Sequence, residues 1–175
     1  MQKKKLIFFT LGLFIFVTVG LTMVFFLIPT SSVFAVEARN ENLGITISPG
    51  KELIRVKNMA PGDKVSAPLT VINKGKKDFS LDISAEMERG DKLYNKLDLI
   101  ITDPKDNSPM YSGKLSGLKD LDLGILDISK NKTLNIAVGL PNDAGNEYQG
   151  IYTSMKFVLT PFPISQSGNN NHTKD

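Results

Sequence analysis

The 175-residue chain is long enough for one domain and contains no Cys and no Trp, which excludes a fold held by disulfides and a site built on thiolates. Three of its 21 Lys and Arg residues lie at positions 3–5, which leaves 18 basic residues against 18 Asp and Glu in the rest of the chain. The net charge of +3 therefore comes from the N-terminus, and no nucleic-acid partner is expected, because such a partner needs a basic face.

The first 35 residues have the layout of an export leader. Three lysines precede an apolar stretch, Leu6–Ile28, and a small-residue segment follows. Val33 and Ala35 stand at the −3 and −1 positions of a candidate signal-peptidase cut after Ala35, and a second candidate cut follows Ala38. We favour cleavage, which makes residues 1–35 a signal peptide. Because the apolar stretch is long enough to span a bilayer, an uncleaved anchor helix is the alternative, and either form places the rest of the chain outside the cell.

Residues 36–42 are mostly polar and are predicted to form a flexible link. Apolar and polar residues then alternate from Leu43 to Ser48, which predicts a short strand that ends at Pro49-Gly50, and alternation around Ile54 and Val56 predicts a second strand. The first of these strands can pair with its own sheet, which we favour slightly, or add to the edge of a neighbouring molecule.

The clearest strand signals come next. Apolar residues alternate with polar ones over Val65–Ile72 and again over Phe79–Ala85, and the loop between them contains Gly75, which can adopt a positive φ. We predict that these two strands form a β-hairpin. Pro68 has no N–H to donate, so its strand is expected to lie at an edge or to be bulged there.

The middle of the chain is less regular. Residues 86–96 are hydrophilic and are predicted to be a long connection or a short helix. Alternation predicts strands over Leu97–Ile101 and Met110–Leu115. The leucines from Leu118 to Leu126 are spaced more like a helical turn or an irregular crossover than like a strand.

Two further strands, Leu134–Leu140 and Ile151–Leu159, flank the turn-rich loop Pro141–Gly150. Gly150 ends this loop, where a positive φ or close packing is expected. The residues predicted to face inward are Phe79, Leu81, Ile83, Leu134, Ile136, Val138, Met155 and Phe157.

Seven or eight short strands with almost no helix predict an all-β fold. We expect an antiparallel two-sheet sandwich over residues 43–163, of jelly-roll or immunoglobulin-like type, preceded by the N-terminal hydrophobic signal or anchor helix. Residues 164–175 are polar and Asn-rich and are predicted to be a disordered tail.

No catalytic, cofactor-binding or metal-binding residue is predicted, and no enzyme activity is expected. The only His is His172, in the predicted tail, and the sequence has no H-E-x-x-H motif and no His base for a nucleophilic triad. Ser80 and Ser84 fit solvent-facing strand positions. Tyr148 and Tyr152 are expected to pack at a sheet corner rather than to form a ligand platform.

Acidic residues are the candidates for a cation-binding site. Asp103, Asp106 and Asn107 could ligate calcium, but the run lacks the Gly and distal Glu of an EF-hand loop, so a plain turn is favoured and metal binding by Asp103 or Asp106 is left open. The remaining candidates are expected to be solvated or incidental: Asp120, Asp122 and Asp127, and the glycosylation sequons at Asn131 and Asn171.

Several segments together resemble the TasA/camelysin family of Gram-positive surface proteins. The most specific is Ala144–Gly150, which reads A-G-N-E-Y-Q-G. The similarity extends over about residues 59–160. It includes Ala60–Asp63, Leu69–Gly75, Leu93–Leu97, Tyr111–Leu118, Leu123–Leu126 and Lys132–Leu134.

The resemblance implies a jelly-roll-like exported domain that often assembles into biofilm-matrix fibres. We therefore expect a non-enzymatic, secreted or cell-surface structural protein, a fibre subunit or an assembly accessory, whose partners are itself or a related matrix protein, with signal peptidase as its processing enzyme. The alternatives are a binding module for cell wall or a partner protein and, with less support, a camelysin-type metallopeptidase.

Overall fold

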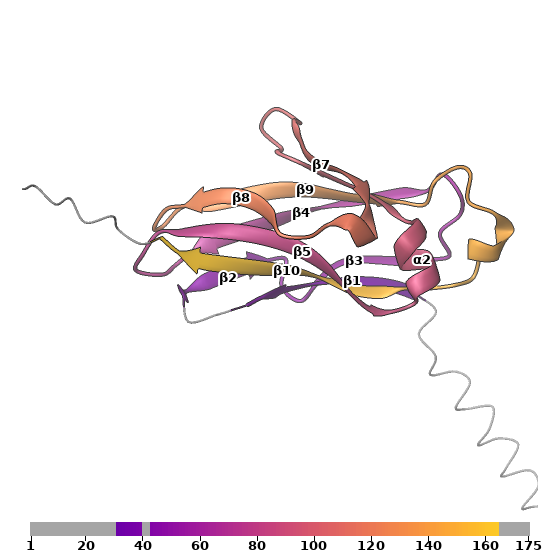
Figure 1. Cartoon of the computed structure of the whole chain (residues 1–175), viewed down its shortest axis with the longest axis horizontal. Coiled ribbons are helices and arrows are strands. Elements are labelled where there is room, and N and C mark those ends of the chain that lie inside the picture. The colour runs from indigo at the N-terminus through magenta and orange to yellow at the C-terminus, as the bar shows by residue number, and fades with distance from the viewer. Residues whose placement is uncertain (1–30, 40–42, 165–175) are drawn as a thin grey trace, which may run out of the picture. The chain divides into compact units, whose positions relative to one another are not determined.

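The computed structural model describes residues 31–39 and 43–164, which form ten strands in two five-stranded sheets (Figure 1). Sheet A has the order β3 (Glu52–Lys57), β1 (Ser31–Ala38), β10 (Ser154–Pro163), β5 (Phe79–Arg89) and β8 (Leu121–Leu126). Sheet B has the order β2 (Ile45–Ser48), β4 (Lys64–Asn73), β9 (Asn131–Gly139), β6 (Asp98–Thr102) and β7 (Pro109–Lys114). Within the described residues, three short helical segments have given bounds: α2 (Asp91–Lys96), η2 (Leu115–Gly117) and η3 (Asn146–Tyr148).

The predicted all-β, two-sheet sandwich is confirmed, and so is its core. Each of the eight residues predicted to face inward is at most 1% exposed. They come from β5, β9 and β10, where alternate side chains point between the sheets, as period-two patterning requires. Among the residues described, no helix is both long and apolar enough to cross a bilayer.

The prediction that all strands are antiparallel is wrong at one pair. β1 and β10 run parallel, with Val33 beside Ser154 and Ala38 beside Leu159. Parallel neighbours cannot be joined by a tight turn, so they are separated in the sequence. Here more than a hundred residues lie between the two strands. No short-range signal in the sequence could have indicated this pairing.

The predicted hairpin between the third and fourth strands is also wrong. β4 pairs with β2 and β9 in sheet B, whereas β5 pairs with β10 and β8 in sheet A. The loop between them therefore crosses from one sheet to the other, and the buried side chains of β4 and β5 belong to the same core. Alternation of apolar and polar residues indicates that each segment has one buried face. This pattern does not distinguish two strands of one sheet from two strands of opposite sheets.

Three boundaries differ from the prediction. Residues 36–38 belong to β1 rather than to a flexible link, and Arg39 is a bend directly after this strand. Positions 40–42 of the predicted link lie outside the described residues. The segment 121–126, predicted as a helical turn or crossover, is strand β8. Residues 86–89 extend β5, and the short-helix alternative holds only for α2. The predicted tail lies outside the described part of the chain except for Ile164.

Pro68 does not lie in an edge strand or at a bulge, because β4 pairs with β2 and β9 and its register with β9 is regular. It lies in β4 opposite Asn135 of β9, beyond the segment Thr70–Asn73 that pairs with β2. Its missing N–H therefore falls on a locally open edge, where no ladder hydrogen bond is lost.

Candidate assembly site at the N-terminal strands

Strand β1 lies inside sheet A, with β3 on one side and β10 on the other (Figure 1). Its backbone is bonded along both edges: Val33 N donates to Thr153 O at 3.1 Å, Val36 N donates to Lys51 O at 3.0 Å, and Arg39 N donates to Leu159 O at 2.8 Å. The segment that directly follows the apolar leader is therefore an internal strand of the sandwich.

The inward side chains of β1 belong to the core. Phe34 is fully buried, and Val36 is 6% exposed. At the start of the strand, Ser32 is buried and its Oγ accepts a hydrogen bond of 3.2 Å from Thr153 N, while Ser31 Oγ accepts one of 3.2 Å from Arg55 Nη1. These bonds satisfy the two serines where β1 enters the sheet.

Glu37 of β1, and Arg39 directly after it, form ion pairs with other strands of sheet A. Lys156 of β10 donates to Glu37 at 2.8 Å, and this bond holds the pKa of the Glu37 carboxyl below its ordinary value and the pKa of Lys156 above its own. Arg39, just after β1, pairs with Glu86 of β5. Exposed pairs contribute little stability, but these two agree with the observed register of β1.

Strand β2 folds back on its own sheet. Residues Ile45–Ser48 pair antiparallel with Thr70–Asn73 of β4, and Lys74 N donates to Gly44 O at 2.8 Å. Two glycines make this approach possible: Gly44 has a φ of +77°, and a Cβ on Gly75 would clash with the carbonyl oxygen of Leu43. The intramolecular pairing that we favoured for this segment is therefore the one observed in the single chain.

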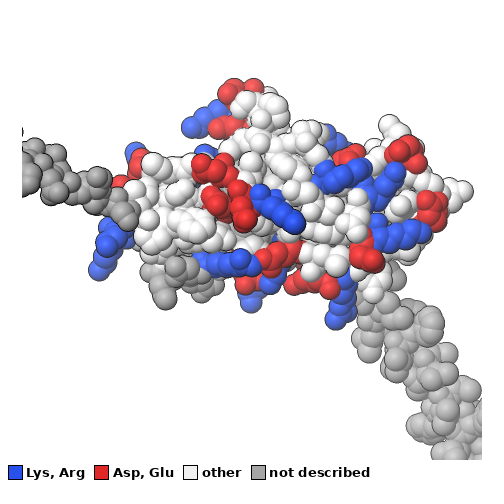
Figure 2. Space-filling model, in the orientation of Figure 1, with Lys and Arg blue, Asp and Glu red and all other residues white. Residues whose placement is uncertain are grey.

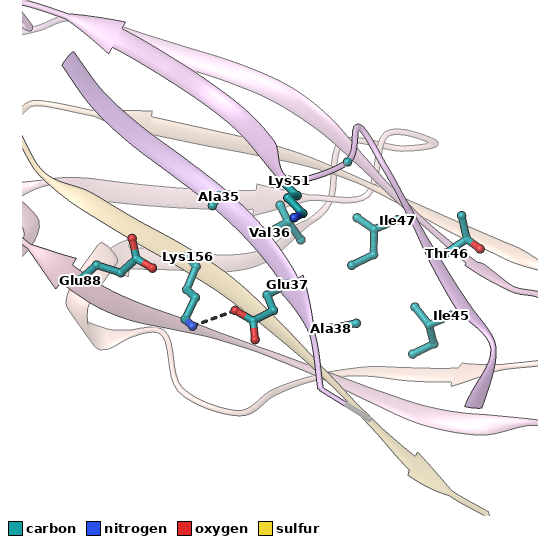
Figure 3. A pocket seen from close by; sticks show the side chains of 11 residues that line it. Ala35, Val36, Glu37, Ala38, Ile45, Thr46, Ile47, Lys51, Glu88 and Lys156 are labelled. Atoms are coloured by element: carbon teal, nitrogen blue, oxygen red, sulfur yellow. Dashed lines mark hydrogen bonds and ion pairs between the residues drawn. The ribbon is translucent and has the colours of Figure 1, made fainter. Parts of the chain in front are cut away.

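A groove of about 750 Å³ lies between β1 and β2 (Figure 3). Half-buried Ile45 and Ile47 line one side, and Val36 and Ala38 contribute from β1. The Glu37–Lys156 ion pair, Glu88 and Lys51 add charge to the lining. The groove thus joins an apolar wall to charged groups beside the two N-terminal strands.

The outermost strands differ in how open they are to a further strand. In β8, Gly124 has a φ of +81°, which distorts that edge of sheet A. The opposite edge, β3, has the charged pair of Arg55 and Glu52. The β7 edge begins with Pro109. The edge formed by β2 is the shortest, and its residues alternate between Ile and small polar side chains.

Asp103 and Asp106 lie in a turn, as predicted, and their side chains bond to its backbone. Asp103 Oδ1 accepts a hydrogen bond of 2.9 Å from Lys105 N, and Asp106 Oδ1 accepts one of 2.9 Å from Ser108 N. The bonds to Ser108 hold the pKa of Asp106 below its ordinary value. Over residues 31–39 and 43–164, no three His, Cys, Asp or Glu side chains are grouped so as to hold a metal ion.

A second group of acidic side chains, from β5, β8 and the residue before β8, lies together on sheet A. Ser84 Oγ donates to Asp120 Oδ1 at 2.9 Å, and Asp82 lies directly opposite Asp122 across the β5–β8 pair. Burial, together with the charges of Asp122 and Asp120, raises the pKa of Asp82. Solvent-facing positions were expected for Ser84 and Asp122, but their proximity depends on strand pairing that the sequence does not reveal.

The other sequence candidates fall at separate places. Tyr148 lies beneath two lysines of α2, with Lys92 Nζ 5.0 Å and Lys96 Nζ 5.9 Å from its ring centre. Asn131, in the first sequon, is exposed at the start of β9, whereas Asn171 and His172 lie outside the described residues. Asp122 and Asp127 are exposed, as expected.

Charges of both signs are interspersed over the face of the domain shown in Figure 2. Acidic and basic side chains alternate in several ion pairs, including Lys96–Asp143 at 3.1 Å and Lys114–Asp98 at 2.6 Å. A mixed surface of this kind favours solubility over attraction of one class of charged ligand.

No family model matches the chain, and no curated protein matches it. Among solved structures, the chain is similar to the ASH / PapD-like domain of human CEP192 (PapD-like domain 7), with 12% sequence identity over 70% of this chain and 87% of that chain and a TM-score of 0.32. It is also similar to AvmM, which catalyses macrocyclization in alchivemycin A biosynthesis, with 10% identity over 77% of this chain and 95% of that chain and a TM-score of 0.35. Similarities of this size assign neither protein's activity to the chain.

Proposed function

We propose that the chain is a non-enzymatic, exported structural protein of a bacterial cell surface or extracellular matrix, acting as a fibre subunit or as an accessory to fibre assembly. The observation that carries the proposal is the placement of β1 and β2. Both follow the apolar stretch in sequence: β1 is inserted between β3 and β10 of sheet A, and β2 is added at the edge of sheet B. A domain built in this way has strand addition as its natural mode of association.

The strand order supports a jelly-roll domain over an immunoglobulin-like one. Consecutive strands from β3 onward alternate between the sheets, except for the β6–β7 pair within sheet B. An eight-stranded set, β3-β10-β5-β8 facing β4-β9-β6-β7, remains when β1 and β2 are set aside. Two Greek keys in two sheets define a jelly roll. The resemblance to TasA and camelysin implies the same architecture.

The assembly mode that we propose is addition of the Leu43–Ser48 segment to a neighbouring molecule. In the single chain this segment occupies its own sheet, so donation requires β2 to leave β4. β2 has only four residues, and its two isoleucines are only partly buried against the core, so its release exposes less apolar surface than the release of an inner strand would. Short edge strands of this kind open at low free-energy cost.

Two matched substitutions test this mode. Gly75→Ala weakens the docking of β2 without altering the segment itself, so it should increase filament formation. Thr46→Pro removes a backbone donor that faces the paired strand in this register and should abolish assembly. Gly50→Ala is the control, because a Cβ at Gly50 meets nothing within 4 Å. Sedimentation and electron microscopy are the measurements. If all three variants assemble like the wild type, donation by this segment is wrong.

A cell-wall or partner-protein binding module is the second candidate, and the groove beside β1 and β2 favours it because it offers apolar and charged groups together. Co-pelleting with isolated cell wall, in the absence of filaments, would support binding over assembly. Casein cleavage that a chelator stops would support the camelysin-type metallopeptidase and contradict the structural role.

A further inference from the structure

The two candidate signal-peptidase sites lie within the fold. Ala35 is in the middle of β1 and Ala38 is its last residue, whereas a signal-peptide cut is expected in an exposed segment before the mature domain. This observation rests on the proposed function only in assuming that the chain is exported.

A cut at either site would remove part of the sandwich. Cleavage after Ala35 separates Ser31–Ala35 from the domain, including the fully buried side chain of Phe34 and all five residues that pair with β3. Cleavage after Ala38 removes the entire strand, together with its six parallel pairs to β10. In both cases β3 loses every residue of β1 that pairs with it, and β10 loses half of its parallel pairs in the first case and all of them in the second.

The folded domain also conceals these sites from a protease. Proteases bind their substrates as extended segments, commonly by pairing with the substrate backbone. In the folded domain the backbone of β1 is bonded to β3 on one side and to β10 on the other, so once the domain has folded, the bond after Ala35 becomes accessible only when β1 leaves the sheet. An internal strand opens much less often than an edge strand.

We infer that the leader is retained, and that β1 connects a permanent N-terminal membrane anchor to the extracellular sandwich. The apolar stretch Leu6–Ile28 and the buried strand Ser31–Ala38 then act together: one holds the chain in the bilayer and the other protects the connection from cleavage. The protein is accordingly a membrane-tethered assembly accessory rather than a released fibre subunit.

The test is the N-terminus of the full chain, expressed with a C-terminal tag in a Gram-positive host that has active signal peptidases. We expect the membrane fraction to hold the tagged uncut chain, whose untagged mass is 19.2 kDa. A tagged product that begins at Val36 or Arg39 in the medium would overturn the inference. Protease treatment of intact cells reports export separately: a tag that is protected inside the cell contradicts the proposed function, whereas an accessible but cut protein contradicts only retention of the leader.

Two substitutions in β1 separate burial from local sequence. Phe34→Asp changes the −2 position, leaves Val33 and Ala35 intact, and should release β1, so most of the chain should now be cut after Ala35. Glu37→Gln removes only the exposed pair with Lys156 and should leave the chain uncut.

If the Phe34→Asp variant is degraded before it can be recovered, hydrogen exchange on the wild-type chain in detergent decides the question. The amides of Val33 and Val36 should be as strongly protected as those in the centre of β10. Rapid exchange in β1, with β10 protected, would overturn the inference.

Discussion

The side-chain amide of Asn73, in β4, donates a hydrogen bond of 2.9 Å to the carbonyl oxygen of Leu126, in β8, and so connects the two sheets. The same nitrogen donates to Lys77 O at 3.0 Å, and the side-chain oxygen accepts from Gly75 N at 2.9 Å. Asn73 is fully buried. Its amide therefore holds the loop that carries the chain from sheet B to sheet A.

Replacing Asn73 with Ala should lower the free energy of unfolding by at least about 2 kcal/mol, because each buried polar group left without a partner costs roughly 1–3 kcal/mol. Urea denaturation of the domain that starts at Ser31 measures this. Asn131→Ala, at an exposed position in β9, is the control and should change stability little. Equal stabilities of the two variants would contradict the role given to Asn73.

Ile136→Ala should cost about 2–5 kcal/mol, because it removes three heavy atoms from a site with no exposure to solvent and leaves a cavity. Chemical denaturation is again the measurement, with the half-buried neighbour Asn135→Ala as the control. A loss well under 1 kcal/mol at Ile136 would show that the cavity term is absent and that the inner face of β9 is packed loosely.

Gly150→Val should destabilise the domain through its backbone. Gly150 has a φ of +71°, and a Cβ at this position meets nothing within 4 Å, so strain and not crowding is the cause. Such strain costs an L-residue roughly 1–2 kcal/mol. Gly50→Val is the matched control, because Gly50 is equally open and does not have a positive φ. In thermal denaturation, the Gly150→Val domain should melt at a lower temperature than the Gly50→Val domain.

Asp82→Asn should stabilise the domain at neutral pH. The folded-state pKa of Asp82 is raised above its ordinary value of 3.8, so its ionised form is disfavoured in the fold. As the pH falls through the folded pKa towards 3.8, the native state takes up a proton first and the penalty disappears. The advantage of the variant should therefore be present near pH 7 and vanish below about pH 4.

The gain from Asp82→Asn is small, about 0.2–1 kcal/mol, because like charges on a solvent-facing sheet are screened. Denaturation midpoints over a pH series measure it. Asp127→Asn removes the same charge from an exposed position after β8 and serves as the control. An advantage that grows as the pH falls would have the wrong sign.

The sequence by itself determined the local features of this protein. Alternation over Phe79–Ile83 and Leu134–Val138 identified strands and their buried faces, because the side-chain period of a strand depends only on the backbone of that strand. The turn-rich loop ending at Gly150 predicted a positive φ, because a glycine without a Cβ adopts this backbone conformation easily. The Asp103–Pro109 turn also follows from the residues themselves.

Only the tertiary structure decided which strands are neighbours. β4 and β5 lie in opposite sheets because each pairs with other, distant strands, and the buried amide of Asn73 bonds the crossing region to β8, a contact between residues 53 positions apart. The sequence of Ser31–Ala38 has the pattern of a cleavage site and the start of a link. It forms a strand because its backbone pairs with β3 and β10 and the side chain of Phe34 is buried in the core. Strand pairing is a property of distant segments, and their hydrogen bonds and core contacts exist only once the chain has folded.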